Sequence, residues 1–149
     1  MNMKIAIASD HAGYYLKQET LDIVKKLGHT PIDLGTNYPN ESVDYPDFAQ
    51  KVALEINSGK AERGIIVCGS GVGASIAANK FKGIRAGLCH DTYSAHQAVE
   101  HDDMNALCMG ARIIGTALAQ EIITAFLGAK FSNEERHKRR LDKVISFEK

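Results

Sequence analysis

The sequence predicts one three-layer α/β/α domain, residues 1–149, built on a sheet of five parallel strands. Two patterns carry this prediction. Short apolar runs alternate along the whole chain with segments whose apolar residues recur at helical spacing. The apolar runs are continuous, which is typical of parallel strands covered by helices on both faces. With 149 residues, 44% of them hydrophobic and 24% charged, the chain is long enough to bury such a core.

Each element follows from its apolar residues and from the residues at its ends. The strands are expected at residues 4–9, 30–34, 64–68, 85–89 and 105–109. The helices are expected at residues 14–27, 47–58, 75–79, 92–101, 118–127 and 132–146. Gly28, Gly59 and Gly128 follow three of these helices, where glycine commonly ends a helix. Asp91 precedes the fourth helix and is typical of an N-cap.

Polar residues follow directly after the predicted strands. Asp10-His11 follows the first strand, Cys68-Gly69-Ser70 the third, His90-Asp91 the fourth and Arg112 the fifth. In a doubly wound, Rossmann-like sheet, ligands bind beyond the carboxyl ends of the strands. The sequence therefore predicts a site along one edge of the sheet.

The third strand ends at Cys68 and opens into the glycine turn Gly69-Ser70-Gly71-Val72-Gly73, which leads into a helix. Glycines let the backbone approach a ligand, and free N–H groups at a helix N-terminus attract anions. A thiolate is favoured there, so Cys68 is a candidate base or nucleophile. The alternative is a small buried apolar residue, as most free cysteines are. The turn lacks the spacing of dinucleotide and P-loop motifs, which makes nucleotide binding a weaker alternative.

Three further groups are candidates for binding or proton transfer. Asp10-His11 suits a hydroxyl and a phosphate or ring oxygen, or else a helix cap beside a surface histidine. His101 lies among carboxylates in a polar turn before the fifth strand, and carboxylates favour the protonated imidazole of a general acid. Arg136 and Arg140 share one face of the basic helix 132–146. Their like charges repel each other by about 0.2–0.5 kcal/mol, which a bound phosphate would offset. A solvated surface helix is the alternative.

The composition argues against several classes of protein. The formal net charge is zero, which gives no general attraction to nucleic acid or to an anionic membrane. Three cysteines without C-x-x-C spacing indicate neither a disulfide framework nor a zinc site. A metal site at His90, His96 and His101 has no recognised ligand spacing. No apolar run reaches membrane length and no leader precedes the first strand. We expect a cytoplasmic protein without cofactor or metal.

A thiol base, a histidine acid, an anion-holding turn and a phosphate-binding face together favour one reaction type. Removing a proton next to a carbonyl, as in aldose–ketose isomerisation of a phosphorylated sugar, needs this set of groups.

Seven segments occur in a family order over nearly the whole chain: 9–13, 44–46, 68–73, 77–80, 83–86, 101–105 and 110–112, followed by Arg136-His137 and Arg140. On these segments the sequence resembles the type B ribose-5-phosphate isomerase family, which also includes the galactose-6-phosphate isomerase subunits. The resemblance implies that ribose 5-phosphate and ribulose 5-phosphate interconvert through a cis-enediolate, a step of the pentose phosphate pathway. It also implies a homodimer or a dimer of dimers, with the site at the subunit interface.

The resemblance assigns roles to individual residues. Cys68 matches the proton-abstracting base and His101 the ring-opening acid, while Ser70 adds a hydroxyl. The residues that it places at the substrate are Asp10, His11, Tyr45, Gly69, Ser70, Gly71, Val72, Gly73, Asp102, Arg112, Arg136, His137 and Arg140. Asp102 stands where the family often has asparagine, and we expect it to accept a sugar hydroxyl and to shift substrate preference. The alternatives are a hexose 6-phosphate substrate, such as allose or galactose 6-phosphate, and a non-catalytic sugar-phosphate-binding protein.

Overall fold

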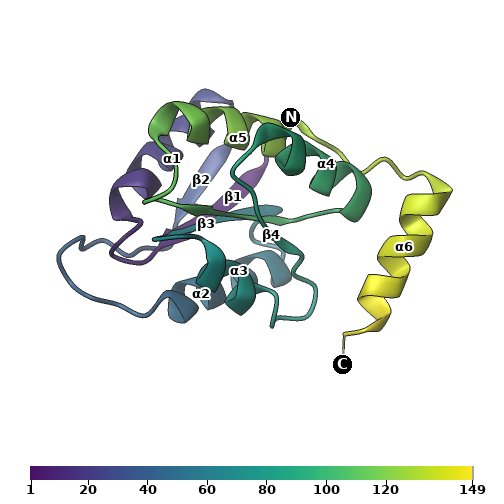
Figure 1. Cartoon of the computed structure of the whole chain (residues 1–149), viewed down its shortest axis with the longest axis horizontal. Helices are drawn as coiled ribbons and strands as arrows, with labels where there is room; N and C mark the ends of the chain where they lie inside the picture. The colour runs from purple at the N-terminus through teal and green to yellow at the C-terminus, as the bar shows by residue number, and fades with distance from the viewer. Residues whose placement is uncertain (149) are drawn as a thin grey trace.

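The computed structural model describes residues 1–148, in which five strands and six helices follow one another along the chain (Figure 1). The strands are β1 (Lys4–Ser9), β2 (Thr30–Asp33), β3 (Arg63–Cys68), β4 (Ala86–Leu88) and β5 (Ala106–Gly110). The helices are α1 (Tyr14–Lys26), α2 (Tyr45–Asn57), α3 (Val72–Ala78), α4 (Thr92–Asp102), α5 (Thr116–Gly128) and α6 (Glu135–Ser146). Lys149, the last residue of the expected domain, lies outside the described residues.

The strands form one parallel sheet with the order β2-β1-β3-β5-β4. Helices α1, α4 and α5 cover one face, and α2 and α3 cover the other (Figure 1). Within β1, Ile5 and Ile7 pack toward the first group of helices while Ala6 and Ala8 pack toward the second, so both faces are buried. This arrangement confirms the predicted Rossmann-like α/β/α fold.

The sheet order brings three loops together at one edge. The chain passes from β3 to the edge strand β4 and then returns to β5, which pairs with β3 so that Cys68 lies opposite Gly110. The carboxyl ends of β1, β3 and β5 are therefore neighbours. Asp10, the glycine turn after Cys68, and Arg112 all follow these ends directly.

The environment of His101 differs from the expectation. This residue lies in the last turn of α4 rather than in a turn before β5. The N-cap of α4 is Asp91, whose Oδ1 accepts a hydrogen bond of 2.6 Å from the backbone N–H of Ser94, and the helix continues through Asp102. The expected cap is thus confirmed, and helical hydrogen bonding extends past the residue that we had placed in the turn.

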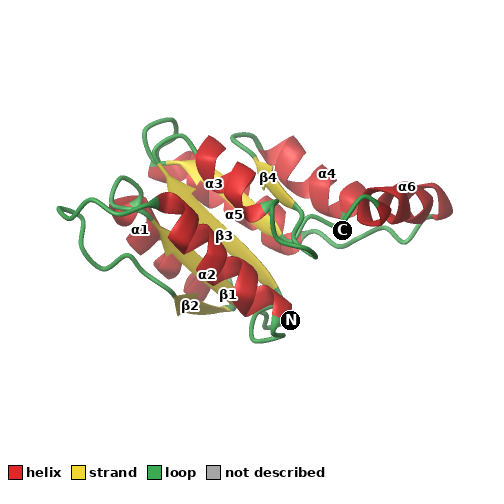
Figure 2. Ribbon diagram, turned by 90° about the horizontal axis from the view of Figure 1, so that it is seen from below, coloured by secondary structure: helices red, strands yellow, loops and turns green. Residues whose placement is uncertain are grey.

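The C-terminal helix begins later than expected. The basic helix predicted from residue 132 starts at Glu135, because Asn133 adopts a left-handed conformation with φ of 59°, which interrupts helical geometry. This helix, α6, lies outside the three layers and beside α4 (Figures 1 and 2). The loop that joins β2 to α2 projects at the opposite end of the molecule (Figure 2).

Candidate active site

A pocket of about 330 Å³ lies where β1, β3 and β5 end. Its lining residues are Asp10, Tyr45, Cys68, Gly69, Ser70, Gly73, Arg112 and Ile113. All of them except Ile113 were predicted from the sequence. Ile113 is an exposed apolar side chain next to Arg112, and nothing in its spacing separates it from other apolar residues.

The sulfur of Cys68 lies against the start of α3. Gly71 is the N-cap of that helix and has a φ of 82°, a left-handed conformation that favours glycine. In this conformation its backbone N–H donates a hydrogen bond of 3.2 Å to Sγ of Cys68. The N–H group at the start of α3 therefore points at the sulfur. The sulfur is buried at the mouth of the glycine turn and lines the pocket.

The other two cysteines lie in the core. Burial, followed by the charge of Asp91, raises the pKa of Cys89 to about 11. Burial, followed by the neighbouring Cys68, also raises the pKa of Cys108. Both side chains therefore remain protonated thiols near neutral pH, as expected for residues that only fill the core. Cys89 follows β4 rather than belonging to it.

Asp10 and Arg112 give the pocket charges of opposite sign. Oδ1 of Asp10 accepts a hydrogen bond of 3.0 Å from the backbone N–H of Gly13, which holds the carboxylate in place. The backbone N–H of Arg112 donates to the carbonyl of Gly69 at 3.0 Å, and its guanidinium lies beside the same glycine. The pocket can thus pair a hydroxyl with the carboxylate and an anionic oxygen with the guanidinium.

The ring of Tyr45 closes one side of the pocket by lying against Gly73. A methyl group on Gly73 would lie 2.6 Å from Cζ of Tyr45, so the ring reaches this position only because residue 73 has no side chain. Tyr45 is 40% exposed, as the first residue of α2. The glycine turn therefore makes room for an aromatic wall in addition to presenting its N–H groups.

His11 follows Asp10, and the loop between β2 and α2 holds its ring in place. Its Nδ1 accepts a hydrogen bond of 3.1 Å from the backbone N–H of Val43, in the loop between β2 and α2. An accepting Nδ1 places the proton of the neutral ring on Nε2, which is then a donor. His11 is not among the residues that line the pocket.

Five predicted residues lie elsewhere in the chain: His101, Asp102, Arg136, His137 and Arg140. Helix α4 begins beyond the carboxyl end of β4 and returns along the sheet for 11 residues, or about 16 Å. Its last turn therefore lies near the amino ends of the strands, whereas Cys68 lies at their carboxyl ends. Helix α6 lies beside α4 (Figure 2). The chain thus holds two separate groups of the predicted site residues.

Within the second group, the imidazole rings of His101 and His137 stack with centroids 4.0 Å apart and planes at 25°. Nε2 of the Gln97 side chain lies 3.0 Å from Nδ1 of His101. Since an amide nitrogen only donates, Nδ1 accepts and the proton of the neutral His101 ring resides on Nε2. Arg136 and Arg140 are exposed on α6, one helical turn apart.

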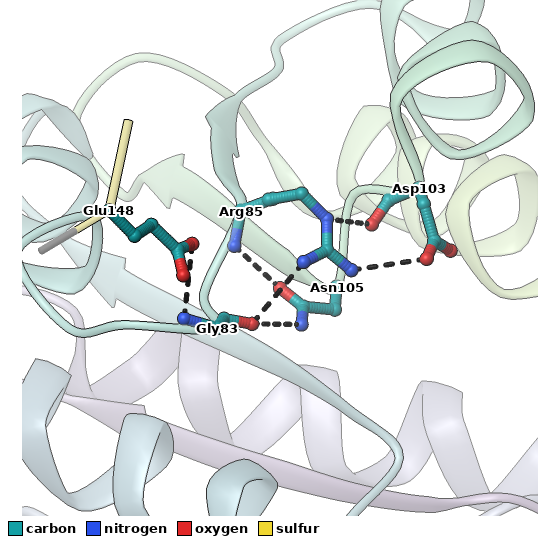
Figure 3. A network of polar contacts seen from close by, with 5 residues as sticks. All are labelled: Gly83, Arg85, Asp103, Asn105 and Glu148. Atoms are coloured by element: carbon teal, nitrogen blue, oxygen red, sulfur yellow. Dashed lines mark hydrogen bonds and ion pairs between the residues drawn. The ribbon is translucent and has the colours of Figure 1, made fainter. Parts of the chain in front are cut away.

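A polar network fixes the turn after α4 (Figure 3). Arg85 donates from Nε to the carbonyl of Asp103 at 2.8 Å and pairs through Nη2 with its Oδ2 at 3.1 Å. The side chain of Asn105 accepts from the backbone N–H of Arg85 and donates to the carbonyl of Gly83. Glu148 accepts from the N–H of Gly83 at 3.2 Å, which ties the chain beyond α6 to the same loop. Sequence reasoning did not identify this network.

A larger groove of about 550 Å³ separates α6 from residues 79–86. Asp102 lines this groove, together with Leu141, Val144 and Phe147 from the α6 side. Phe147 is 77% exposed, and Val144 is 49% exposed. The groove therefore presents apolar surface next to the group that contains His101.

Two other properties bear on the possible functions. Among residues 1–148, no three histidine, cysteine or acidic side chains are arranged to hold a metal ion, and Nε2 of His90 accepts from the N–H of Gly110. No helix in this part of the chain is long and apolar enough to cross a membrane.

Comparison with known proteins points to one family. The family described as Ribose/Galactose Isomerase matches residues 5–144. The chain is 43% identical to ribose-5-phosphate isomerase B of Escherichia coli, over 97% of this chain and 96% of that one. It is 44% identical to D-erythrulose-4-phosphate isomerase of Pectobacterium atrosepticum, over 87% and 85%. The solved structure of Clostridium thermocellum ribose-5-phosphate isomerase B is 49% identical and superposes with a TM-score of 0.94, covering 98% of this chain and 97% of that one.

Proposed function

Because the chain belongs to the Ribose/Galactose Isomerase family and is an isomerase, we propose that it interconverts D-ribose 5-phosphate and D-ribulose 5-phosphate. One observation carries the proposal. The sulfur of Cys68 accepts the N–H of Gly71 in a pocket that also holds a carboxylate and a guanidinium. The pocket therefore places a base beside hydrogen-bond donors that can stabilise a developing negative charge. No part of the proposal needs a cofactor.

In the proposed reaction, the Cys68 thiolate removes the proton from C2 of the open-chain aldose. The resulting negative charge spreads over O1 and O2 of a cis-enediolate, where N–H groups of the turn Gly69–Gly73 and the Ser70 hydroxyl donate to it. The thiol then returns the proton to C1, while the hydroxyl proton moves from O2 to O1. The sum is an aldose converted to a ketose with no net gain or loss of atoms or electrons.

Ribose 5-phosphate is mostly a closed ring, so an acid must protonate the ring oxygen before this step. We assign that role to His101, whose Nε2 carries the proton because Nδ1 accepts from Gln97. Within one chain His101 lies in the last turn of α4, a helix about 16 Å long that runs away from the carboxyl ends of the strands, and it does not line the pocket of Cys68. The proposal therefore requires a homodimer or a dimer of dimers, with the site between subunits.

In that assembly one subunit supplies the pocket around Cys68, and the other supplies the acid and part of the phosphate site. Arg136 and Arg140 project from one face of α6, where a phosphate offsets their mutual repulsion. Exposed apolar side chains support an interface near the Cys68 pocket: Val72 and Ile76 on α3 are 46% and 58% exposed. We place this activity in the cytoplasm and in the pentose phosphate pathway.

The test of the reaction is turnover of ribose 5-phosphate by the wild type and by Cys68→Ala. Loss of the base is expected to lower kcat by about 10²–10⁴-fold while the variant still binds the substrate. Allose 6-phosphate, galactose 6-phosphate and erythrulose 4-phosphate are measured alongside. Faster turnover of one of these would keep the mechanism and change the substrate. If none of them is converted, the protein is a non-catalytic sugar-phosphate binder.

The test of the shared site is complementation between two inactive variants. Cys68→Ala and His101→Ala are mixed, dissociated and reassociated. If each site takes Cys68 from one subunit and His101 from the other, a mixed dimer has one intact site of two. Random reassociation of equal amounts makes about half of the dimers mixed, so the mixture recovers about a quarter of the wild-type activity. No recovery, with mixed dimers demonstrated by mass spectrometry, would show that both residues act within one chain.

Asp102 is exposed at the last position of α4, next to His101. We propose that its carboxylate accepts a hydroxyl of the sugar and thereby affects which sugar phosphate is preferred. Asp102→Asn keeps the size and removes the charge. An unchanged ranking of the four sugar phosphates, with unchanged KM values, would refute this role.

A further inference from the structure

His137 is buried on a helix that is otherwise mostly exposed. Among the residues of α6 it is the one classed as buried, and only 1% of its surface is accessible. The neighbouring Arg136 and Arg140, by contrast, are exposed. A single buried residue on a polar helix marks where that helix is attached to the body of the protein. His137 therefore borders the exposed face that carries the arginines.

The hydrogen bonding of His137 keeps its ring fixed. Nδ1 lies 2.5 Å from Oγ of Ser132 and 3.4 Å from a carboxylate oxygen of Glu134. The carboxylate places the proton on Nδ1, which leaves Nε2 as a lone pair. Nε2 is buried with no partner among the described residues. Burial, followed by the charge of His101, lowers the pKa of His137, which favours the neutral ring. Such a ring offers no exposed donor to a phosphate.

The ring of His137 stacks on the half-buried ring of His101, with centroids 4.0 Å apart and planes at 25°. The stack sets the plane of the His101 ring, and the bond from Gln97 to Nδ1 sets its rotation within that plane. The segment before α6 is tied to α4 as well, because the N–H of Ser132 donates to the carbonyl of Glu100 at 2.9 Å. One contact from α6 and one from the segment before it thus hold α4 at and next to the proposed acid.

We infer that His137 is a positioning residue that holds the ring of His101 by stacking and does not bind the phosphate itself. This inference rests on the proposed role of His101. It also links the phosphate-binding face of α6 to the acid, since Arg136 and His137 are adjacent. A phosphate that orders the arginines also orders the ring beneath His101.

Two variants of similar bulk separate stacking from other roles. His137→Phe keeps a flat ring, and His137→Leu keeps an apolar side chain without one. Both lose the bond to Ser132, so their difference isolates the ring. For ribose 5-phosphate, His137→Leu is expected to lower kcat by about 10–100-fold with KM within about twofold, because a displaced acid loses alignment. His137→Phe is expected to retain kcat within about threefold. The control is His96→Phe, which changes a partly exposed histidine on α4, the helix that carries His101.

Proton NMR of the His101 ring supplies a readout that needs no activity. The C2–H signal of His101 feels the ring current of its neighbour, so it is expected to shift in His137→Leu and to stay close to its wild-type position in His137→Phe. Raised KM in both variants with kcat unchanged would identify a phosphate ligand and overturn the inference. Equal loss of kcat in both variants would overturn it too, because the ring nitrogen would then be essential. If the wild type converts no sugar phosphate, the proposed function fails and the NMR result alone decides the stacking.

Discussion

Replacing Arg85 by alanine is expected to destabilise the turn that follows α4. Asp103 occupies this turn in a left-handed conformation, with φ of 51° and ψ of 46°, which is unfavourable for most side chains. The guanidinium of Arg85 holds the residue there through its carbonyl at 2.8 Å and its carboxylate at 3.1 Å (Figure 3). Asp102 and His101 immediately precede this turn.

The two bonds differ in strength. The Arg85 side chain is 20% exposed, so its charge-assisted bond to the carbonyl contributes about 1.5–3 kcal/mol. The Asp103 side chain is 44% exposed, and water screens the ion pair, which reduces its contribution to about 0.2–1 kcal/mol. Arg85→Ala is therefore expected to lower the free energy of unfolding by about 2–4 kcal/mol. Asp103→Asn keeps the carbonyl bond and a residue that tolerates the left-handed region, and is expected to cost less than about 1 kcal/mol.

Urea denaturation of the two single variants and the double variant measures these energies. Arg85→Ala already removes the ion pair. The double variant is therefore expected to unfold with a free energy within about 0.5 kcal/mol of that of Arg85→Ala. A cost below about 0.5 kcal/mol for Arg85→Ala would refute the reasoning. Asp103→Asn costing as much as Arg85→Ala would show that the carboxylate, and not the carbonyl, carries the interaction.

Three other predictions follow from individual contacts. Iodoacetamide is expected to modify Cys68 well before the other two cysteines, whose pKa values are raised by burial; peptide mass spectrometry checks this, and equal labelling would contradict it. Gly73→Ala is expected to raise KM for ribose 5-phosphate because the new methyl displaces the exposed Tyr45 ring. A gain in helix propensity of up to about 1 kcal/mol is expected to keep the melting temperature nearly unchanged. An unaltered KM would argue against the Tyr45 ring as a wall of the pocket. Since burial lowers the pKa of His137, the unfolded chain binds its proton more tightly than the folded chain does, and stability present above pH 6.5 is lost as the pH falls below it. Urea midpoints at about pH 7.5 and 5.5 should therefore fall further for the wild type than for His137→Phe, and equal falls would count against the shift.

Local patterns in the sequence determined the strands, most of the helices and half of the candidate site. Apolar periodicity records which residues face a core, and residues such as Asp91 and Gly28 mark helix ends through their own backbone and side-chain chemistry. Cys68 and its glycine turn were identifiable because the whole anion-holding unit is contiguous in the chain. The residues after β1 and β5 were identifiable because parallel strands bring their carboxyl ends to one edge.

The tertiary structure alone decided how these parts are combined. Periodicity does not specify which strands are neighbours, so the position of β5 between β3 and β4 could not be predicted. The separation of His101 from Cys68 depends on the direction and length of α4. The sequence identifies both residues as candidates but does not show how far apart they lie. His137 looked like a member of a charged surface run, yet packing against His101 buries it. Contacts between residues far apart in the chain leave no local signal, which is why the stacking of His137 on His101 and the separation of this group from Cys68 emerged only from the fold.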